Sequence, residues 1–538
     1  MTGPSPWWGW GSGGERAPLS PHAIAMLVEL VGEATPTPAV DIDDVALPDP
    51  APIPDAIVDA VGAANVLTGK RDRVRHAAGM SYPDLVRLRT GRLDDAPDAV
   101  VVPPDREAVV ALLEACAREA VAVVPFGGGT SVVGGVDPGR ESFERLVSVD
   151  LSSLRSVSVD DLSLTARLGP GLTGADAERE LAAHGLTLGH FPQSFERATI
   201  GGFAATRSAG QASSGYGRFD ALVTSACLDA PAGELRTRET PHTAAGPALR
   251  EVIVGSEGTL GVITEVDVRV RRAPETRRYE GWIAPEFASG VDIIRRLAQQ
   301  DALPDVIRVS DRVETRVSLG LAGARGVRRR AFDAYLDLRR RSDGCIVIAG
   351  WEGEGEAVAR RRALGHRVLR HGGAASLGAG PGRAWYRGRY RGPHLRDELL
   401  DLGYMVETLE TAHTWSRLEG LYAAVRDAIE SALASAGMAG IVFCHLSHAY
   451  RDGASLYYTF LAPSRPGYEI DGWRAVKRAA CEAIVATGGT ITHHHGIGRD
   501  HAPYMRDEVT GLGVEALRAV KERLDPTGIM NPGKLLPG

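Results

Sequence analysis

The chain has 538 residues, a formal net charge of −7 and a hydrophobic share of 44%. This length exceeds what one hydrophobic core usually serves, so two or three domains are expected. The acidic balance argues against a nucleic-acid-binding protein, because such proteins carry a basic surplus over a domain. The five cysteines are odd in number and scattered, which excludes a disulfide framework and favours reduced thiols.

No leader-like segment and no run of 18 uncharged apolar residues occurs in the sequence. We therefore expect a soluble cytoplasmic protein. The pair Ser20-Pro21 predicts a helix that continues to Val31. The tryptophans before it, at 7, 8 and 10, are expected to pack against another domain, and residues 35–54 are expected to form a linker.

The next segments alternate strand, helix and strand. A strand is predicted at 99–102, followed by a helix that ends at Glu119 with an apolar face, and then by a β-branched strand at 120–124. Pro125 to Ser131 follow as a glycine loop whose backbone N–H groups could form an anion-binding nest. A plain surface turn is the alternative interpretation. No GxGxxG opens a helix here, so a nicotinamide site is disfavoured.

Strands are predicted near 147–149, 164–168 and 266–270, and a helix at 172–181. A second glycine motif, GSEGTLGVITE, occupies 255–265, and a third, DPTGIMNPGK, occupies 525–534. Six glycines or prolines from Gly372 to Gly382 predict a mobile loop that could act as a lid. An arginine-rich helix is predicted at 327–341, either as a solvated face or as a patch for an anionic membrane.

Two further stretches carry side chains suited to catalysis. A strand at 456–460 contains Tyr457 and Tyr458, whose side chains must point to opposite faces. His493, His494 and His495 lie between glycines, so at most two of the three rings should point into one site. Imidazoles near neutral pH suit proton transfer or phosphate contact, with a metal ion as the rival use.

The three glycine motifs together resemble those of FAD-linked oxidases of the vanillyl-alcohol oxidase type. With Trp8 to Gly11, the segment 189–210, Arg308, Arg396 and the triple histidine, the chain is identified as a member of the alkyldihydroxyacetonephosphate synthase family. This resemblance implies an α+β fold: a two-lobed FAD-binding domain and a cap domain with an antiparallel sheet and flanking helices. The expected division is 1–93 for an N-terminal helical segment and linker, 94–275 for the FAD-binding domain and 276–538 for the cap.

The resemblance also implies a site. Tyr457 and the three histidines would be catalytic, while Arg396 and Arg308 would bind the substrate. FAD would be bound non-covalently, because Thr130 stands where covalent members often carry a histidine. The implied FAD contacts are Pro125, Phe126, Gly127, Gly128, Gly129, Thr130, Ser131, Gln193, Ser194, Thr199, Gly202, Thr206, Arg207, Ser208, Ala209, Glu257, Gly258, Thr259, Gly261, Val262 and Ile263.

The implied reaction exchanges the acyl chain of acyl-dihydroxyacetone phosphate for a fatty alcohol without net redox change. A homodimer and peripheral association with a membrane are further expectations. The alternative enzyme is an FAD-linked oxidoreductase of a 2-hydroxy acid or a related alcohol, and a flavin-binding protein without catalysis is a third hypothesis. We expect no metal ion. The related FAD-linked 2-hydroxyacid dehydrogenases bind a divalent ion through a glutamate and a two-histidine motif. Here His494 stands in place of the glutamate, and the segment His445 to Asp452 lacks the second histidine of the motif.

Overall fold

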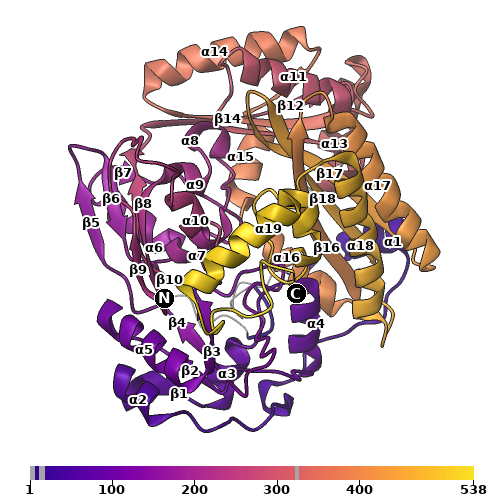
Figure 1. Ribbon diagram of the computed structural model, residues 1–538. Coiled ribbons are helices and arrows are strands. Elements are labelled where there is room, and N and C mark those ends of the chain that lie inside the picture. The colour runs from indigo at the N-terminus through magenta and orange to yellow at the C-terminus, as the bar shows by residue number, and fades with distance from the viewer. Residues whose placement is uncertain (1–6, 11–17, 322–325, 538) are drawn as a thin grey trace.

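The computed structural model describes residues 7–10, 18–321 and 326–537. Its elements form two small lobes, built on the first half of the chain, and a larger part built on the second half (Figure 1). None of the helices in these ranges is both long and apolar enough to cross a membrane.

The first lobe is a four-stranded sheet in the order β1-β2-β4-β3, in which β2 and β3 both run parallel to β4. Helix α5 begins after Asp105, whose carboxylate accepts the N–H of Ala108 and so caps the helix. Its predicted apolar face is buried against the sheet, so this part of the prediction is confirmed. The elements of this lobe are β1 (Val66–Leu67), β2 (Ala99–Val101), β3 (Val121–Phe126), β4 (Arg145–Asp150), α2 (Asp55–Val61), α3 (Lys70–Arg75), α4 (Tyr82–Thr90) and α5 (Arg106–Glu119).

The second lobe is a five-stranded antiparallel sheet in the order β5-β6-β10-β8-β9. Its strands are β5 (Val157–Asp160), β6 (Thr165–Leu168), β8 (Val223–Ala230), β9 (Gly233–Arg236) and β10 (Val262–Arg269). Its helices are α6 (Gly174–Ala182), α7 (Ile200–Thr206), α8 (Ser213–Tyr216), α9 (Phe219–Leu222) and α10 (Arg250–Ile253), and β7 (Leu186–Thr187) pairs with β11 (Arg271–Arg272).

The second half is organised around a seven-stranded antiparallel sheet in the order β15-β12-β14-β13-β17-β18-β16, which confirms the predicted cap sheet. Its strands are β12 (Thr276–Ala284), β13 (Val306–Ser310), β14 (Cys345–Gly353), β15 (Ala375–Gly378), β16 (Tyr404–Thr414), β17 (Ile441–Ala449) and β18 (Gly453–Pro463). The helices are α11 (Phe287–Gln299), α12 (Arg312–Leu321), α13 (Gly326–Leu338), α14 (Gly355–His371), α15 (Ala379–Gly388), α16 (Gly392–Asp401), α17 (Leu418–Ser435), α18 (Glu469–Thr487) and α19 (Met505–Leu524).

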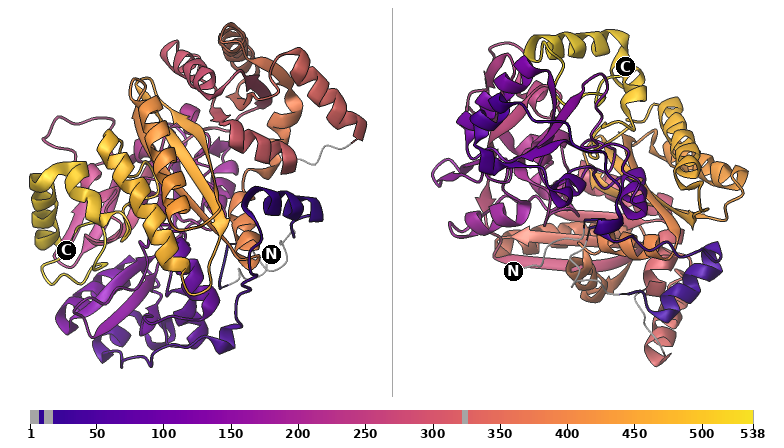
Figure 2. Two further views of the ribbon diagram at one scale, coloured as in Figure 1. Left: turned by 90° about the vertical axis from the view of Figure 1, so that its right-hand side faces the viewer. Right: turned by 90° about the horizontal axis from the view of Figure 1, so that it is seen from below.

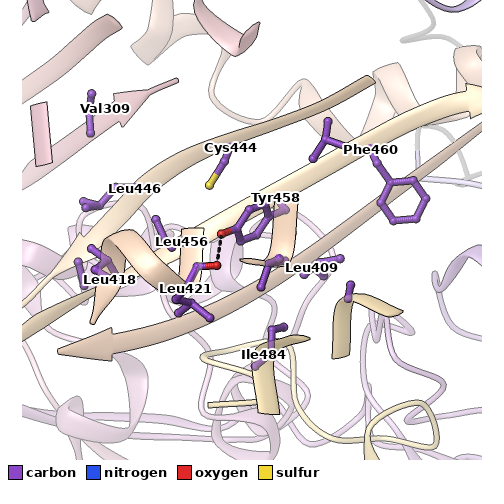
Figure 3. Packing of buried hydrophobic residues seen from close by; sticks show 14 of the residues in the cluster. Val309, Leu409, Leu418, Leu421, Cys444, Leu446, Leu456, Tyr458, Phe460 and Ile484 are labelled. Carbon is purple, nitrogen blue, oxygen red and sulfur yellow. Dashed lines mark hydrogen bonds between the residues drawn. The ribbon is translucent and has the colours of Figure 1, made fainter. Parts of the chain in front are cut away.

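The two faces of β18 have different surroundings. Tyr458 is completely buried among Leu409, Leu421, Cys444 and Leu456, under helices α17 and α18 (Figure 3). Its hydroxyl lies 3.4 Å from the carbonyl oxygen of Leu421. Tyr457 lies on the other face and lines a cavity, so the predicted alternation of the two tyrosines is confirmed.

One predicted loop is wrong. Residues 375–378 form strand β15 and residues 379–382 form the first turn of α15, and β15 pairs with β12 at the edge of the cap sheet. A Cβ atom on Gly382 would lie 2.3 Å from the backbone nitrogen of Glu280, so this glycine is there because α15 packs directly on β12. The arginine-rich helix, α13, ends at Leu338, before Arg339 to Arg341. The side chains of Arg328 and Arg329 lie outside the described residues.

The N-terminal segment packs on the second half of the chain. Helix α1 (Pro21–Val31) has the predicted bounds and is capped by Ser20. Leu27 and Val31 of this helix pack with Tyr404, Val406 and Leu461, so the indigo α1 lies beside the strands of the cap sheet (Figure 2). Trp10 is buried and its backbone N–H donates to Asp397 of α16 at 2.7 Å. This confirms the predicted packing on another part of the molecule for Trp10, whereas Trp7 and Trp8 pack against a small cluster formed by residues 40–96.

Candidate active site

A cavity of about 1070 Å³ lies where the two lobes meet the cap sheet. Its lining comes from the glycine loop after β3, the segment around α7, the GSEGTLG motif, strands β13, β17 and β18, and helices α1, α12, α15 and α16. This volume lies just above the roughly 300–1,000 Å³ that is usual for pockets that bind drug-sized ligands. The cavity can therefore hold a large cofactor and a substrate together.

The glycine loop is shaped by close contact with the segment before α7. A Cβ atom on Gly128 would lie 2.0 Å from the carbonyl oxygen of Arg197, and one on Gly127 would lie 2.4 Å from Oγ1 of Thr199. Gly129 has φ +62°, a conformation that disfavours other residues. These glycines therefore let two backbone segments meet along one wall of the cavity.

Glu257 joins the motifs that lie far apart in the sequence. Its carboxylate accepts the N–H groups of Ile497 and Gly498, at 2.6 and 2.8 Å, directly after the triple histidine. Burial raises the pKa of Glu257 to about 7, although these two donors oppose the shift. Asn531 of the third motif donates to the carbonyl oxygens of Glu257 and Gly135. The three glycine motifs and the histidines thus form one connected structure.

Most of the residues proposed to contact FAD line this cavity, but three do not. Arg207 pairs with Glu251, at 2.9 Å, and faces away from the cavity. The hydroxyl of Thr259 donates to the carbonyl oxygen of Ser256, and Val262 is buried in the core of the first lobe. The residues that do line the cavity are 125–131, Gln193, Ser194, Thr199, Gly202, Thr206, Ser208, Ala209, Glu257, Gly258, Gly261 and Ile263.

Glu410 of β16 holds the triple-histidine loop in place. Its carboxylate accepts the backbone N–H groups of His494 and His495, both at 2.9 Å, and also that of His493. Burial alone would raise the pKa of Glu410, but the facing histidines and these N–H donors bring it well below its usual range. The loop is therefore bound to a buried anion that the sequence analysis did not identify.

Two of the three histidine rings face the cavity. His494 and His495 line it, whereas His493 is buried behind them. Nε2 of His493 lies 2.7 Å from the hydroxyl of Tyr450, and its Nδ1 lies 3.0 Å from Nδ1 of His494. This arrangement confirms that at most two of the rings point into one site.

Tyr457 lies beside these histidines and at the end of a polar chain. Its ring packs at 5.6 Å from the ring of His495 and stacks at 4.8 Å on that of His445. Nδ1 of His445 lies 3.1 Å from Glu314. Glu314 in turn accepts a hydrogen bond from Arg308 on β13, and both Arg308 and His445 line the cavity. Burial raises the pKa of Tyr457 to about 12, so the phenol stays protonated near neutral pH.

Arg396 brings a positive charge to the cavity wall. It lies on α16 with 7% of its surface exposed, and its Nη1 donates to the carbonyl oxygen of Met80 at 3.2 Å. Its Nε and Nη2 have no hydrogen-bond partner among the residues that the structure describes, and the nearest carboxylate contact, with Glu407, is 3.9 Å long. A buried guanidinium with free donors suits a phosphate group.

One end of the cavity is apolar. Its walls come from α1, α12, α16 and the ends of β17 and β18. A Cβ atom on Gly320 of α12 would lie 2.5 Å from the sulfur of Met26 on α1, so these two helices are in contact. The apolar residues are Leu19, Ala23, Met26, Leu27, Leu30, Val317, Leu319, Leu321, Leu395, Leu399, Ile441 and Leu461. Long hydrocarbon chains fit such a lining.

Comparison with known proteins assigns the fold to a family. The family model for an FAD binding domain matches residues 97–238, and that for the C-terminal domain of FAD linked oxidases matches residues 273–535. The chain is 32% identical to the alkyldihydroxyacetonephosphate synthase of Dictyostelium discoideum over 513 residues, which are 93% of this chain and 84% of that protein. The enzyme of the same name from Trypanosoma brucei brucei is also 32% identical, over 518 residues and the same shares.

The chain belongs to the alkyldihydroxyacetonephosphate synthase family. A solved alkyldihydroxyacetonephosphate synthase structure superimposes with a TM-score of 0.85 at 28% identity and covers 98% of both chains. Members of this family are FAD-dependent enzymes. The cavity fits this cofactor: Gly127 and Gly128 line one wall without side chains, and a Cβ atom on either would collide with the segment 197–199 behind that wall. When FAD is bound, residues 125–131 with Glu257, Gly258, Gly261 and Ile263 would hold it.

Several residues that shape this site are not evident from sequence patterns. Glu410 and Glu314 are isolated carboxylates in the sequence, and only the fold brings them to His493–His495 and Arg308. Arg389 also lines the cavity, and its guanidinium lies 4.3 Å from the ring of Tyr386. The cluster of arginines and aromatic residues at 383–391 is the one signal that could have indicated it.

Proposed function

We propose that this protein exchanges the acyl chain of acyl-dihydroxyacetone phosphate for a fatty alcohol and so forms an ether lipid precursor. The observation that carries this proposal is the continuity of one cavity. It runs from the flavin-binding loops past Arg396, Tyr457 and the histidines to a wall of apolar side chains. A phosphate at one end of a substrate and a hydrocarbon chain at the other match these two regions.

The residues of this cavity have separate roles in the proposal. FAD supplies the reactive centre at which the substituent on C1 of the substrate is exchanged. Arg396 offers two free guanidinium nitrogens to the phosphate, and Arg308 supports it with a second positive charge. Tyr457, His494 and His495 move protons at C1 and at the incoming alcohol, because their rings line the cavity next to one another.

The overall reaction breaks the C1–O bond to the acyl group and forms a C1–O bond to the alcohol. Acyl-dihydroxyacetone phosphate and alcohol give alkyl-dihydroxyacetone phosphate, a carboxylate and one proton. No electron acceptor is consumed. This distinguishes the proposal from oxidation of a 2-hydroxy acid, for which the cluster of His448, His493 and His494 would be the supporting observation, since their ring nitrogens lie within 4.8 Å of one another and could bind a metal ion.

The deciding experiment incubates the purified protein with acyl-dihydroxyacetone phosphate and a labelled fatty alcohol under argon, without an electron acceptor. Label in an alkali-stable ether is the expected result. Turnover that needs an acceptor, with 2-hydroxy acids as substrates, would reject the exchange reaction and favour the dehydrogenase.

We also propose that the protein associates with a membrane and forms a homodimer. The domain boundaries near residues 93 and 275 are part of the same proposal. Leu321 is 43% exposed at the end of α12 and lines the apolar part of the cavity, and Leu338 of α13 is 81% exposed. Arg312, Arg339 and Arg340 are also exposed. Apolar side chains beside arginines suit an anionic lipid surface, from which fatty substrates could enter. Flotation with anionic vesicles, but not with neutral ones, is the expected result.

A further inference from the structure

A second depression lies behind the histidine loop, away from the large cavity. It has a volume of about 440 Å³ and is formed by the ends of β16 and β18, the end of α18 and the start of α19. Asp452, Asp507 and Glu508 line it and are exposed to solvent. Tyr450 also lines this depression, and it is absent from the lining of the large cavity.

Three side chains connect the two spaces. The hydroxyl of Tyr450 lies 2.7 Å from Nε2 of His493, and Nδ1 of His493 lies 3.0 Å from Nδ1 of His494. His494 lines the large cavity, whereas His493, 7% exposed, lines neither space. His493 therefore uses one ring nitrogen on each side, and the series of contacts is unbroken from His494 at the cavity to Tyr450 at the depression.

The proposed exchange reaction, on which this argument rests, requires a path for a proton. Each turnover converts an ester and an alcohol into an ether, a carboxylate and one proton. The proton appears beside His494, in a cavity that is apolar at its other end and that substrate and cofactor fill. Hydrocarbon conducts protons poorly, since a charge there is not solvated. A second way out is therefore needed.

We infer that Tyr450 and His493 relay this proton from His494 to the solvent in the second depression. His494 takes the proton at Nε2 and gives up the one at Nδ1 to Nδ1 of His493. His493 gives up its Nε2 proton to the oxygen of Tyr450, whose own hydroxyl proton passes to water. No bond between heavy atoms changes and no oxidant is used. Tyr450 is a positioning and relay residue, because it does not touch the substrate.

The charges around His494, His493 and Tyr450 favour passing the proton on over keeping it bound. Burial lowers the pKa of both His493 and His494, so the rings stay neutral between turnovers. Glu410 lies 3.6 Å from Nδ1 of His494 and can stabilise the imidazolium that forms in passing. Arg218 is the positive group near Tyr450 and disfavours a proton that remains there. The proton then passes to the water of the depression.

The test compares Tyr450→Phe with Tyr458→Phe in the FAD-loaded protein, with ether formation measured in H₂O and in D₂O. Tyr458 is the matched control, because its hydroxyl lies in the core and bonds to the backbone carbonyl oxygens of Leu421 and Tyr422. For Tyr450→Phe we expect the rate of ether formation to fall roughly tenfold to a hundredfold, which is at or below the lower end of the usual range for acid–base groups. We also expect a larger solvent isotope effect than in the parent. Tyr450→Ala, which opens the depression towards His493, should regain activity with added imidazole.

The outcomes separate the relay from the function on which it rests. A parent that makes no ether overturns both. A parent that makes ether, with Tyr450→Phe equally fast and its isotope effect unchanged, overturns the relay alone. A slower Tyr450→Phe without a larger isotope effect, and a Tyr450→Ala that imidazole does not rescue, would reduce Tyr450 to a structural support for His493. Activity that a chelator removes and Zn²⁺ restores would place a metal ion between His448, His493 and His494 and would also overturn the relay.

Discussion

Tyr457 and Tyr458 are neighbours with the same functional group, and the fold gives them opposite surroundings. Tyr457 faces the cavity with its phenol beside His445 and His495. Tyr458 faces the core under α17 (Figure 3). The alternation of a strand alone therefore separates a candidate catalytic group from a packing residue.

This pair leads to a first prediction. Tyr457→Phe should lose ether formation by about a hundred- to ten-thousandfold while FAD content and melting temperature stay at parental values, because only a proton donor is removed. Tyr458→Phe should lose little activity. Rates for both variants, measured beside their flavin absorbance, check this. Equal loss in the two variants would remove Tyr457 from the chemistry.

Arg396 carries the second prediction at this scale. Arg396→Lys keeps the charge but loses the two-pronged donor geometry, so KM for the phosphate substrate should rise roughly tenfold to a hundredfold, the equivalent of one charge-assisted hydrogen bond. FAD binding should not change. Arg391→Lys, at the exposed start of the same helix, is the control. An unchanged KM in Arg396→Lys would place the phosphate elsewhere.

At the scale of elements, strand β16 determines where the histidine loop lies. The loop has no regular structure between Gly488 and Ile497, so its backbone N–H groups have no strand or helix carbonyl oxygens to bond to. The carboxylate oxygens of Glu410 accept these hydrogen bonds instead. One side chain on a strand thus fixes three consecutive backbone N–H groups. The same carboxylate makes the loop sensitive to acid.

The third prediction concerns this sensitivity. The pKa of Glu410 is lower in the folded protein than its ordinary value of 4.5, so its contribution to stability is complete above that pH and is lost as the pH falls towards the folded-state value. Glu410→Gln places an amide N–H group against a backbone donor and should cost about 1–3 kcal/mol at pH 7. The difference in melting temperature from the parent should shrink below pH 4.5. Glu419→Gln, exposed on α17, should match the parent at every pH.

Helix α1 carries the fourth prediction. Met26 faces the apolar part of the cavity, whereas Ala25 on the same helix is exposed. Met26→Trp should shorten the space for hydrocarbon and shift the preference towards shorter alcohols. Excluding three methylene groups, at about 0.8 kcal/mol each, would lower relative kcat/KM for a long chain by roughly fiftyfold. Ala25→Trp should leave the preference unchanged, and a parallel shift in both variants would mean that α1 acts only through stability.

At the scale of the molecule, local patterns predicted the elements whose residues interact within a few positions. Helices α1 and α5 and strand β3 were predictable because capping, periodicity and β-branching are local. Residues 372–382 were not, because their glycines allow α15 to pack on β12, a contact that no local pattern encodes. Glu410 and Tyr450 were not identified as site residues, because they meet His493 across 83 and 43 positions. The domain boundaries stay predictions.

The fifth prediction tests how the whole site retains its cofactor. Thr130 on the glycine loop offers no imidazole for attachment to flavin, so acid precipitation should leave a yellow supernatant and a colourless pellet. Absorbance of the supernatant and fluorescence of the washed pellet measure this directly. A pellet that remains fluorescent after washing would show that FAD is attached through a bond.

Residues 529–531 close the first lobe. The N–H of Val123 in β3 donates to Ile529 at 2.8 Å, the N–H of Asn531 donates back to Val123, and the side chain of Asn531 bridges Gly135 and Glu257. During biosynthesis, these residues leave the ribosome about 380 residues after Asp150, where the rest of the lobe ends, a delay on the order of twenty to eighty seconds. Through that interval β3 has an unpaired edge, so the nascent chain should depend on chaperones and should acquire its flavin only after translation.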